Sequence, residues 1–281
     1  MTEIKKEIPL EILKEADELQ DIYSKDPRQN SFNALVLGKK GSGKSFLART
    51  CRKPVHIDSF DPGGTKGLKD LILKDGKPTG IIIADTRYES EDPKDPKMFV
   101  EWRKQMEKRA KMNYFDHLGT YILDSSTTWS ETIMNWILKN AHIAGEAPRW
   151  AHDYVPQKVQ IRNWIREMLD LPCDFIMTGH LEGEKDEVSG RMTYEYMTTG
   201  KGVILIPLLF DELYIMDPKE SSKGTNYRIL TKATGSYTAC SRLAREGLLE
   251  QYEEANIKSI LKKVGLPTQD KPLFLTKGEQ K

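Results

Sequence analysis

The sequence predicts an α/β fold in which a mainly parallel central sheet is flanked by helices and carries a β-hairpin excursion. Short apolar runs alternate with longer amphipathic stretches along most of the 281 residues, as is typical of strand–helix units that build a parallel sheet. One apolar run ends in a glycine-rich turn at residues 38–45, and another ends in Asp124. Polar residues directly after buried strands mark the sheet edge at which α/β proteins bind ligands.

The glycine-rich turn has the phosphate-binding pattern G-x-x-x-x-G-K-S, between a predicted strand at 32–37 and a predicted helix at 44–52. Glycines let the backbone wrap closely around a polyphosphate and point N–H groups inward, and the helix start adds positive potential. We expect Lys44 to reach the β- and γ-phosphates and the Ser45 hydroxyl to bind Mg²⁺. The predicted nucleotide-binding residues are Gly38, Lys39, Lys40, Gly41, Ser42, Gly43, Lys44, Ser45 and Phe46.

The apolar run at residues 118–123 ends in Asp124 and has the form of a Walker B strand. In such a strand the terminal carboxylate lies beside the phosphate loop and holds Mg²⁺ through water. Asp124 follows the loop by about 80 residues and precedes a predicted helix, and this context strengthens the assignment. Ser45 and Asp124 are therefore the predicted metal-binding pair.

Two aspartates, Asp58 and Asp61, lie at the end of a short predicted strand at 55–58. Because they follow a strand of the parallel sheet, either could polarise the attacking water or assist the metal as a catalytic residue. The alternative is that they form an Asx turn before the Pro-Gly sequence that follows.

A further core strand at 173–180 ends in a polar tip that contains Thr178 and His180. Either side chain would lie near the γ-phosphate and respond to its loss. The alternative is a histidine that only caps the strand end. A metal site at His180 is not expected, because no second ligand lies at motif spacing.

The composition limits the partners and the location. The net charge is +1, so nucleic-acid binding requires a local basic patch and cannot rest on bulk charge. The sequence shows no apolar stretch of membrane-spanning length and no N-terminal signal region, and its three cysteines are widely spaced. We therefore expect a cytoplasmic protein without a membrane partner.

Taken in order, the phosphate loop, the acidic loop at 58–61, the strand ending at Asp124 and the strand ending at His180 resemble a RecA-like P-loop ATPase core. The chain is most similar in this respect to nucleotide-binding proteins of bacteriophages, some of which are single-strand annealing proteins or recombination ATPases. The resemblance spans about residues 32–245 and is specific at the phosphate loop. It implies ATP and Mg²⁺ as cofactors, and no guanine-specifying N-K-x-D motif is present.

The resemblance divides the chain into three segments. Residues 1–30 are expected to form an N-terminal helical extension, 31–245 the RecA-like ATPase domain, and 246–281 a C-terminal helix and tail. The N-terminal helix would pack on the core, pack on a neighbouring subunit, or remain loosely attached. A hairpin is expected to turn at Ser189-Gly190.

The resemblance also implies a homo-oligomer whose subunits share ATP sites. A basic residue of one subunit would then neutralise charge on the γ-phosphate of the next. Lys232 is the first candidate, followed by Arg228 and Arg242, and ordinary surface charge is the alternative for each. The family often has a catalytic glutamate where this chain has Phe60, so either Asp61 substitutes or hydrolysis is slow and the protein switches with bound nucleotide.

The family places a DNA-facing loop at residues 183–200. Arg191, Lys201 and the neighbouring tyrosines favour contact with single-stranded DNA there, whereas the acidic first half of the segment opposes it. The chain is therefore expected to be an ATPase that acts on DNA in phage-type recombination or annealing, in the bacterial host cytoplasm if it is phage-encoded. A phage or host replication or recombination protein is a further expected partner.

The alternative function is a nucleotide-switched scaffold or loader whose target is a protein partner. A small-molecule kinase is less favoured, because the sequence shows no arginine-rich lid.

Overall fold

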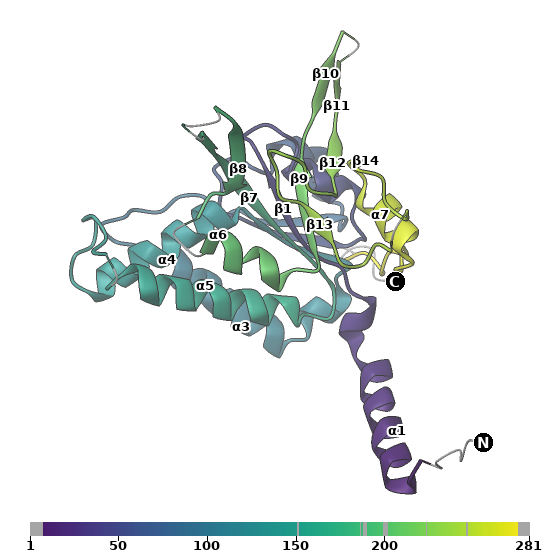
Figure 1. The fold of residues 1–281 in the computed structure, drawn as a ribbon. Coiled ribbons are helices and arrows are strands. Elements are labelled where there is room, and N and C mark those ends of the chain that lie inside the picture. Colours follow the sequence, from purple (N-terminus) through teal and green to yellow (C-terminus); the bar gives the residue numbers. More distant parts are fainter. Residues whose placement is uncertain are drawn as a thin grey trace.

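The computed structural model describes residues 8–150, 152–185, 187, 190–198, 202–222, 224–245 and 247–274. A long central sheet runs through the molecule (Figure 1). Its strand order is β14 (Tyr252–Glu254), β12 (Arg228–Leu230), β9 (Glu212–Met216), β1 (Asn33–Gly38), β7 (Asp174–Lys185), β6 (Thr120–Asp124), β2 (Val55–Ser59) and β5 (Ile82–Asp85). All neighbouring pairs from β9 to β5 are parallel, whereas β12 and β14 join in antiparallel orientation. The predicted fold class is thereby confirmed.

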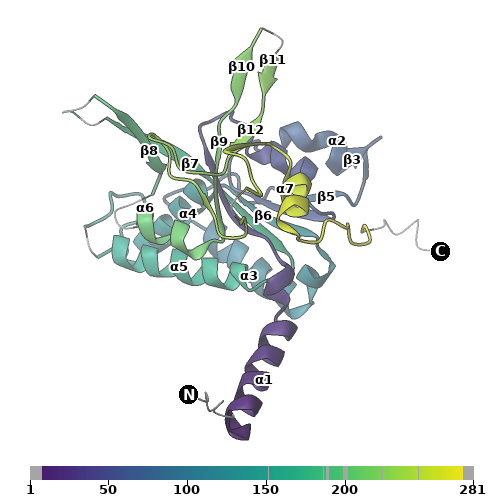
Figure 2. The same cartoon turned by 45° about the vertical axis from the view of Figure 1, so that its right-hand side comes forward.

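Helices cover both faces of the sheet (Figures 1 and 2). One face carries α3 (Met98–Lys111), α4 (Ser126–Asn140) and α5 (Tyr154–Leu169), and the other carries the 3₁₀ helix η2 (Ser45–Thr50) and α7 (Ile257–Val264). Alternate residues of a strand point to opposite faces. Leu35 and Leu37 of β1 therefore join the cluster under α3, α4 and α5, while Ala34 and Val36 join the cluster under η2 and α7.

The remaining elements extend from this sheet or connect its parts. The second strand of the hairpin, β8 (Met192–Tyr196), pairs with the exposed half of β7, and β10 and β11 form a further hairpin. Ser189 of the predicted turn at Ser189-Gly190 lies outside the described residues, and so does Lys201. The other elements are α1 (Leu10–Lys25), η1 (Pro27–Asn30), η3 (Lys66–Leu68), α2 (Lys69–Ile72), β3 (Leu73–Lys74), β4 (Lys77–Pro78), η4 (Tyr114–His117), α6 (Gly202–Leu205), η5 (Pro207–Leu209), β10 (Lys219–Ser221), β11 (Gly224–Asn226) and β13 (Cys240–Ser241).

The register of the central strands brings the predicted functional residues to one edge. Gly38 of β1 lies opposite His180 of β7, and Ser59 of β2 lies opposite Asp124 of β6. Since these strands are parallel, their carboxyl ends form a common edge, which is where α/β sheets bind ligands.

Two local expectations are wrong. The segment after the phosphate loop is the short 3₁₀ helix η2 and not a helix over 44–52, since the backbone is already extended at Cys51. Residues 246–263 do not form one helix: β14 joins the central sheet, and α7 begins only after Asn256, whose side chain accepts a hydrogen bond from the Ser259 N–H (3.1 Å). The sheet therefore extends past the expected domain boundary at 245.

The N-terminal helix α1 buries none of its residues and extends away from the sheet (Figures 1 and 2). Of the three interpretations of this segment, packing on the core of its own chain is wrong. Within the described part of the chain, no helix is long and apolar enough to cross a bilayer.

Candidate nucleotide-binding site

The phosphate loop connects β1 to η2 and depends on two glycines for its shape. Gly41 has a φ of +79° and Gly43 a φ of +93°, in the left-handed region that other residues rarely adopt. A Cβ at Gly43 would also lie only 2.7 Å from Cδ1 of Tyr227. The backbone can follow this path only because both positions lack a side chain.

Lys44 is held over the loop by backbone carbonyl groups. Its Nζ donates to the oxygen of Gly38 (2.8 Å) and of Lys39 (3.1 Å), and lies 3.4 Å from Nδ1 of His180. Burial lowers the pKa of Lys44, although the charges of Asp124 and Asp61 oppose the shift. The ammonium forms no ion pair with the described residues, so an anionic ligand at the loop would stabilise this buried cation.

Asp124 lies at the end of β6 and is almost completely buried. It accepts hydrogen bonds from Ser45 Oγ (2.6 Å) and from Thr178 Oγ1 (2.5 Å). Burial raises the pKa of Asp124, and these two hydrogen bonds only partly oppose the shift. The structure thus brings the two predicted metal-binding residues, Ser45 and Asp124, into direct contact.

Asp61 lies just beyond β2 and belongs to one cluster with Lys44, Asp124 and His180. Its Oδ1 accepts hydrogen bonds from Ser125 Oγ (2.9 Å) and Thr128 Oγ1, and its Oδ2 lies 3.3 Å from Nε2 of His180. Burial alone would raise the pKa of Asp61, but the hydrogen bonds from His180, Thr128 and Ser125 outweigh it and lower the pKa. Asp61 therefore stays ionised and is a weak base.

Asp58 does not belong to this cluster, so the expectation that it acts on the attacking water is wrong. It is completely buried and faces α3, on the side of the sheet opposite to η2. Its oxygens accept hydrogen bonds from Trp102 Nε1 (2.9 Å), Tyr121 OH (2.8 Å) and Arg109 Nη1 (2.8 Å), and His56 Nε2 lies at 2.9 Å. Every contact of Asp58 is structural.

Glu89 is a site residue that the sequence did not suggest. It follows β5 and binds the acidic loop: Oε1 accepts from Ser59 Oγ (2.7 Å), and Oε2 accepts from the Gly63 N–H (2.8 Å). These bonds fix the backbone on either side of Asp61. Glu89 lies in a strongly charged segment, and nothing in the sequence distinguishes it from its neighbours there.

The three basic candidates for a contact across subunits differ in their surroundings. Arg228 pairs with Asp217 (2.8 Å) and lies 3.8 Å above the ring of Tyr252, and Arg242 donates to a backbone carbonyl of its own chain. Lys232 is exposed and has no hydrogen bond or ion pair with the described residues. Lys232 remains the candidate for this role.

The loop, Asp61, Asp124 and His180 line a cavity of about 370 Å³ that also reaches Phe46 and Leu68. Ser42 Oγ is buried in the loop and has no partner among the described residues. The unpaired Lys44 ammonium and the glycine backbone fit a polyphosphate, and the oxygen atoms of Ser45 and Asp124 are the ligand type that Mg²⁺ prefers. When bound, Mg²⁺ would be held by Ser45 and Asp124 and would supply positive charge that neutralises the phosphate groups.

A protein-family model described as an AAA domain matches residues 31–243. The chain belongs to this AAA-domain family. The matched AAA domain contains the phosphate loop, Asp61, Asp124 and His180. The chain is thus a P-loop ATPase, as the sequence predicted. The family implies that the AAA domain uses a nucleotide, typically with Mg²⁺.

One solved structure similar to this chain is that of a KaiC-like protein from Pyrococcus horikoshii. The two sequences are 11% identical, and the match covers 72% of this chain and 78% of that chain with a TM-score of 0.39. Another is the flagellar accessory protein FlaH from Methanocaldococcus jannaschii, with 15% identity, 78% and 85% covered, and a TM-score of 0.38. No curated protein sequence matches the chain.

Asp61 and Glu89 can be separated by substitution. We expect Asp61→Asn to lower ATP turnover by about a hundredfold, because a positioned base contributes about that factor or more. Glu89→Gln should cost less, since it keeps one hydrogen-bonding oxygen toward the loop. Steady-state phosphate release, with nucleotide affinity measured separately, tests this order. A larger loss for Glu89→Gln would make Glu89 the base.

Proposed function

We propose that this AAA-domain ATPase hydrolyses ATP with Mg²⁺ as a homo-oligomer and acts on single-stranded DNA, in phage-type recombination or annealing. In this proposal Lys44 binds the transferred phosphate, Ser45 and Asp124 hold the metal, and Asp61 orients the attacking water. His180 responds to the γ-phosphate, and Lys232 of one subunit reaches the site of the next. The observation that supports it best is the path of β7 between the site and the hairpin.

Strand β7 starts in the core and passes His180, which lies between Lys44 and Asp61. It then continues without interruption into the exposed hairpin, where Leu181 pairs with Tyr196 and Lys185 pairs with Met192. A change in the position of His180 on nucleotide binding would therefore be transmitted along one strand to the hairpin.

A second contact ties the hairpin to the phosphate loop. Lys39 Nζ donates to Tyr194 OH (3.2 Å) and lies 4.3 Å from the centre of the Tyr194 ring. The ring of Tyr237 stacks on the ring of Tyr194, with 5.0 Å between the ring centroids. Since Lys44 binds the carbonyl of Lys39, nucleotide binding at the loop and ligand binding at the hairpin would influence each other.

The hairpin is the proposed DNA-binding element, and Arg191 is its exposed arginine among the described residues. The exposed Glu182 and Glu184 nearby weaken the local attraction for phosphate. We expect binding of a labelled single-stranded oligonucleotide, followed by fluorescence anisotropy, at low salt and its loss as salt rises. Arg191→Ala should reduce by about one the slope of the logarithm of the binding constant against the logarithm of the salt concentration. Arg103→Ala on α3 should leave this slope unchanged. Absence of binding at low salt would contradict the proposal.

The nucleotide-switched scaffold is kept as a second candidate because of Asp61. Both of its oxygens are hydrogen-bonded and its pKa is lowered, so it is a weak base, and Phe60 is buried. Slow turnover that DNA leaves unchanged, together with nucleotide-dependent binding of a protein partner, would favour this function.

A further inference from the structure

The N-terminal helix α1 presents an apolar face that no described residue of its own chain covers. Ile12, Ala16, Leu19 and Tyr23 form a stripe at helical spacing, and the exposed fractions of Ile12, Leu19 and Tyr23 are 58%, 58% and 66%. An isolated helix of this length is only marginally stable in water. The stripe is therefore the natural contact surface for another protein element.

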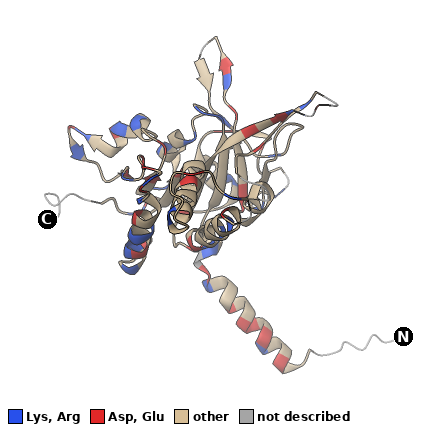
Figure 3. Ribbon diagram, turned by 90° about the vertical axis from the view of Figure 1, so that its left-hand side faces the viewer, with Lys and Arg blue, Asp and Glu red and all other residues tan. Residues whose placement is uncertain are grey.

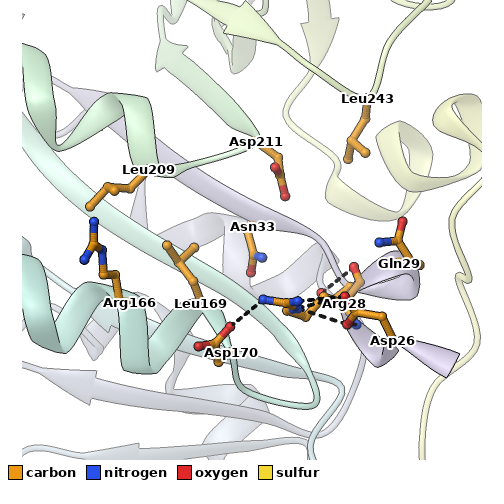
Figure 4. Close-up of a pocket in the computed structure, with 11 residues that line it drawn as sticks. Asp26, Arg28, Gln29, Asn33, Arg166, Leu169, Asp170, Leu209, Asp211 and Leu243 are labelled. Atoms are coloured by element: carbon orange, nitrogen blue, oxygen red, sulfur yellow. Dashed lines mark hydrogen bonds and ion pairs between the residues drawn. The ribbon is translucent and has the colours of Figure 1, made fainter. Parts of the chain in front are cut away.

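The direction of α1 is held at its root. Arg28 binds Asp26, which follows the helix, through Nη2 (2.8 Å) and also pairs with Asp170 after α5 (3.1 Å). Figure 4 shows these contacts at the wall of a cavity of about 520 Å³. They hold the start of the core strand against α5 while α1 leads away from the body (Figures 1 and 2). In this arrangement α1 lies away from the helices of its own subunit.

A groove of complementary character lies between α5 and α6. It is lined mainly by apolar side chains, and three of them, Val155, Val159 and Leu205, have exposed fractions of 55%, 40% and 51%. Leu209 lines both this groove and the cavity at the root of α1, so the two depressions adjoin. Residues 155–162 of α5 line the groove, which is about 12 Å of helix, and the apolar stripe of α1 from Ile12 to Leu19 has the same length.

The charges of the two surfaces are also complementary. Lys158, Arg162 and Arg166 follow one another at intervals of four along α5, and none has an ion pair with a described residue. Figure 3 shows acidic residues along α1. The helix carries five acidic and two basic residues, a net charge of −3. Of the acidic residues, Glu15 borders the apolar stripe, three residues after Ile12 and four before Leu19.

We propose that α1 of one copy packs into the α5–α6 groove of the next copy, with the net negative charge of α1 against the basic row of α5. The two surfaces are different parts of the chain, so the contact is head-to-tail and generates a ring or a filament. This inference rests on the homo-oligomer of the proposed function and names the surface that builds it.

The first test measures self-association of the full chain by sedimentation velocity, with and without ATP. Ile12→Ser with Leu19→Ser should raise the dissociation constant by about tenfold or more. Lys14→Ser with Asp21→Ser, on the polar face of the same helix, should have little effect. These side chains contact no core residue, and unchanged thermal melting would show that each variant is folded. A monomeric wild-type chain, or equal effects of the two pairs, would overturn the proposal.

The second test identifies the occupant of the groove. In a Cys240→Ser background, which removes the exposed cysteine, one chain carries Leu19→Cys and another carries Val159→Cys. Oxidation of the mixture should link the two chains, and neither chain alone should form the product. Links between two Leu19→Cys chains would indicate pairing of α1 with α1. A link within one chain that carries both cysteines, without links in the mixture, would indicate that α1 folds back. Either result, or no link at all, would overturn the proposal.

Nucleotide binding separates this inference from the proposed function. The double variant Ile12→Ser with Leu19→Ser should bind a fluorescent ATP analogue within about twofold of the wild-type affinity, because α1 lies outside the phosphate loop. Lost assembly with retained nucleotide binding supports the α1 contact. Intact assembly without activity on DNA would count against the proposed function alone.

Discussion

Lys44→Ala should lower ATP turnover by at least about a hundredfold and leave the chain folded. The loss follows from electrostatics, because Lys44 supplies the buried, unpaired cation at the phosphate loop, and removal of one such group typically costs that factor or more. Its Nζ bonds only to carbonyl groups and approaches His180, so alanine breaks no ion pair.

The measurement is steady-state phosphate release at saturating ATP, with circular dichroism to follow thermal unfolding. Lys77→Ala provides the control, since Lys77 is exposed on β4 and does not line the cavity. Turnover by Lys44→Ala at the wild-type rate would show that the phosphate site lies elsewhere.

Arg109→Met should lower the free energy of unfolding by about 3–5 kcal/mol, which is typical when one partner of a buried ion pair is removed. The guanidinium of Arg109 pairs with Asp58 (2.8 Å) and also with Asp85, and all three side chains are buried. Without Arg109, two carboxylates remain buried and close together.

Urea denaturation at pH 7 measures this change. Lys104→Met, at an exposed position of the same helix, should change the free energy by no more than about 0.5 kcal/mol. The fold lowers the pKa of both Asp58 and Asp85. The contribution of the pair is therefore complete above the ordinary aspartate pKa of about 3.9 and is lost as the pH falls toward the lowered values. Equal stability of the two variants would contradict this account.

Much of the sheet edge was predictable, because buried strands that end in glycine or aspartate follow a recognisable pattern. The phosphate loop and the strands ending at Asp124 and His180 needed only apolar runs and their polar ends. The sequence also implied that Ser45 and Asp124 would meet, because parallel strands share one edge.

The errors arose where a residue's partners lie far away in the sequence. Asp58 and Asp61 looked equivalent, but alternation along β2 turns Asp58 toward α3, and Arg109, 51 residues later, neutralises it. Glu89 depends in the same way on contacts with a distant loop. Likewise β14 is stabilised by pairing with β12 and not by a local periodicity.

The rate of ATP hydrolysis with and without single-stranded DNA tests the proposed function most directly. At low salt the account predicts Mg²⁺-dependent turnover that rises severalfold when single-stranded DNA is added and falls again as salt weakens DNA binding. Turnover that single-stranded DNA leaves unchanged at low salt, in a protein that binds ATP tightly, would contradict it.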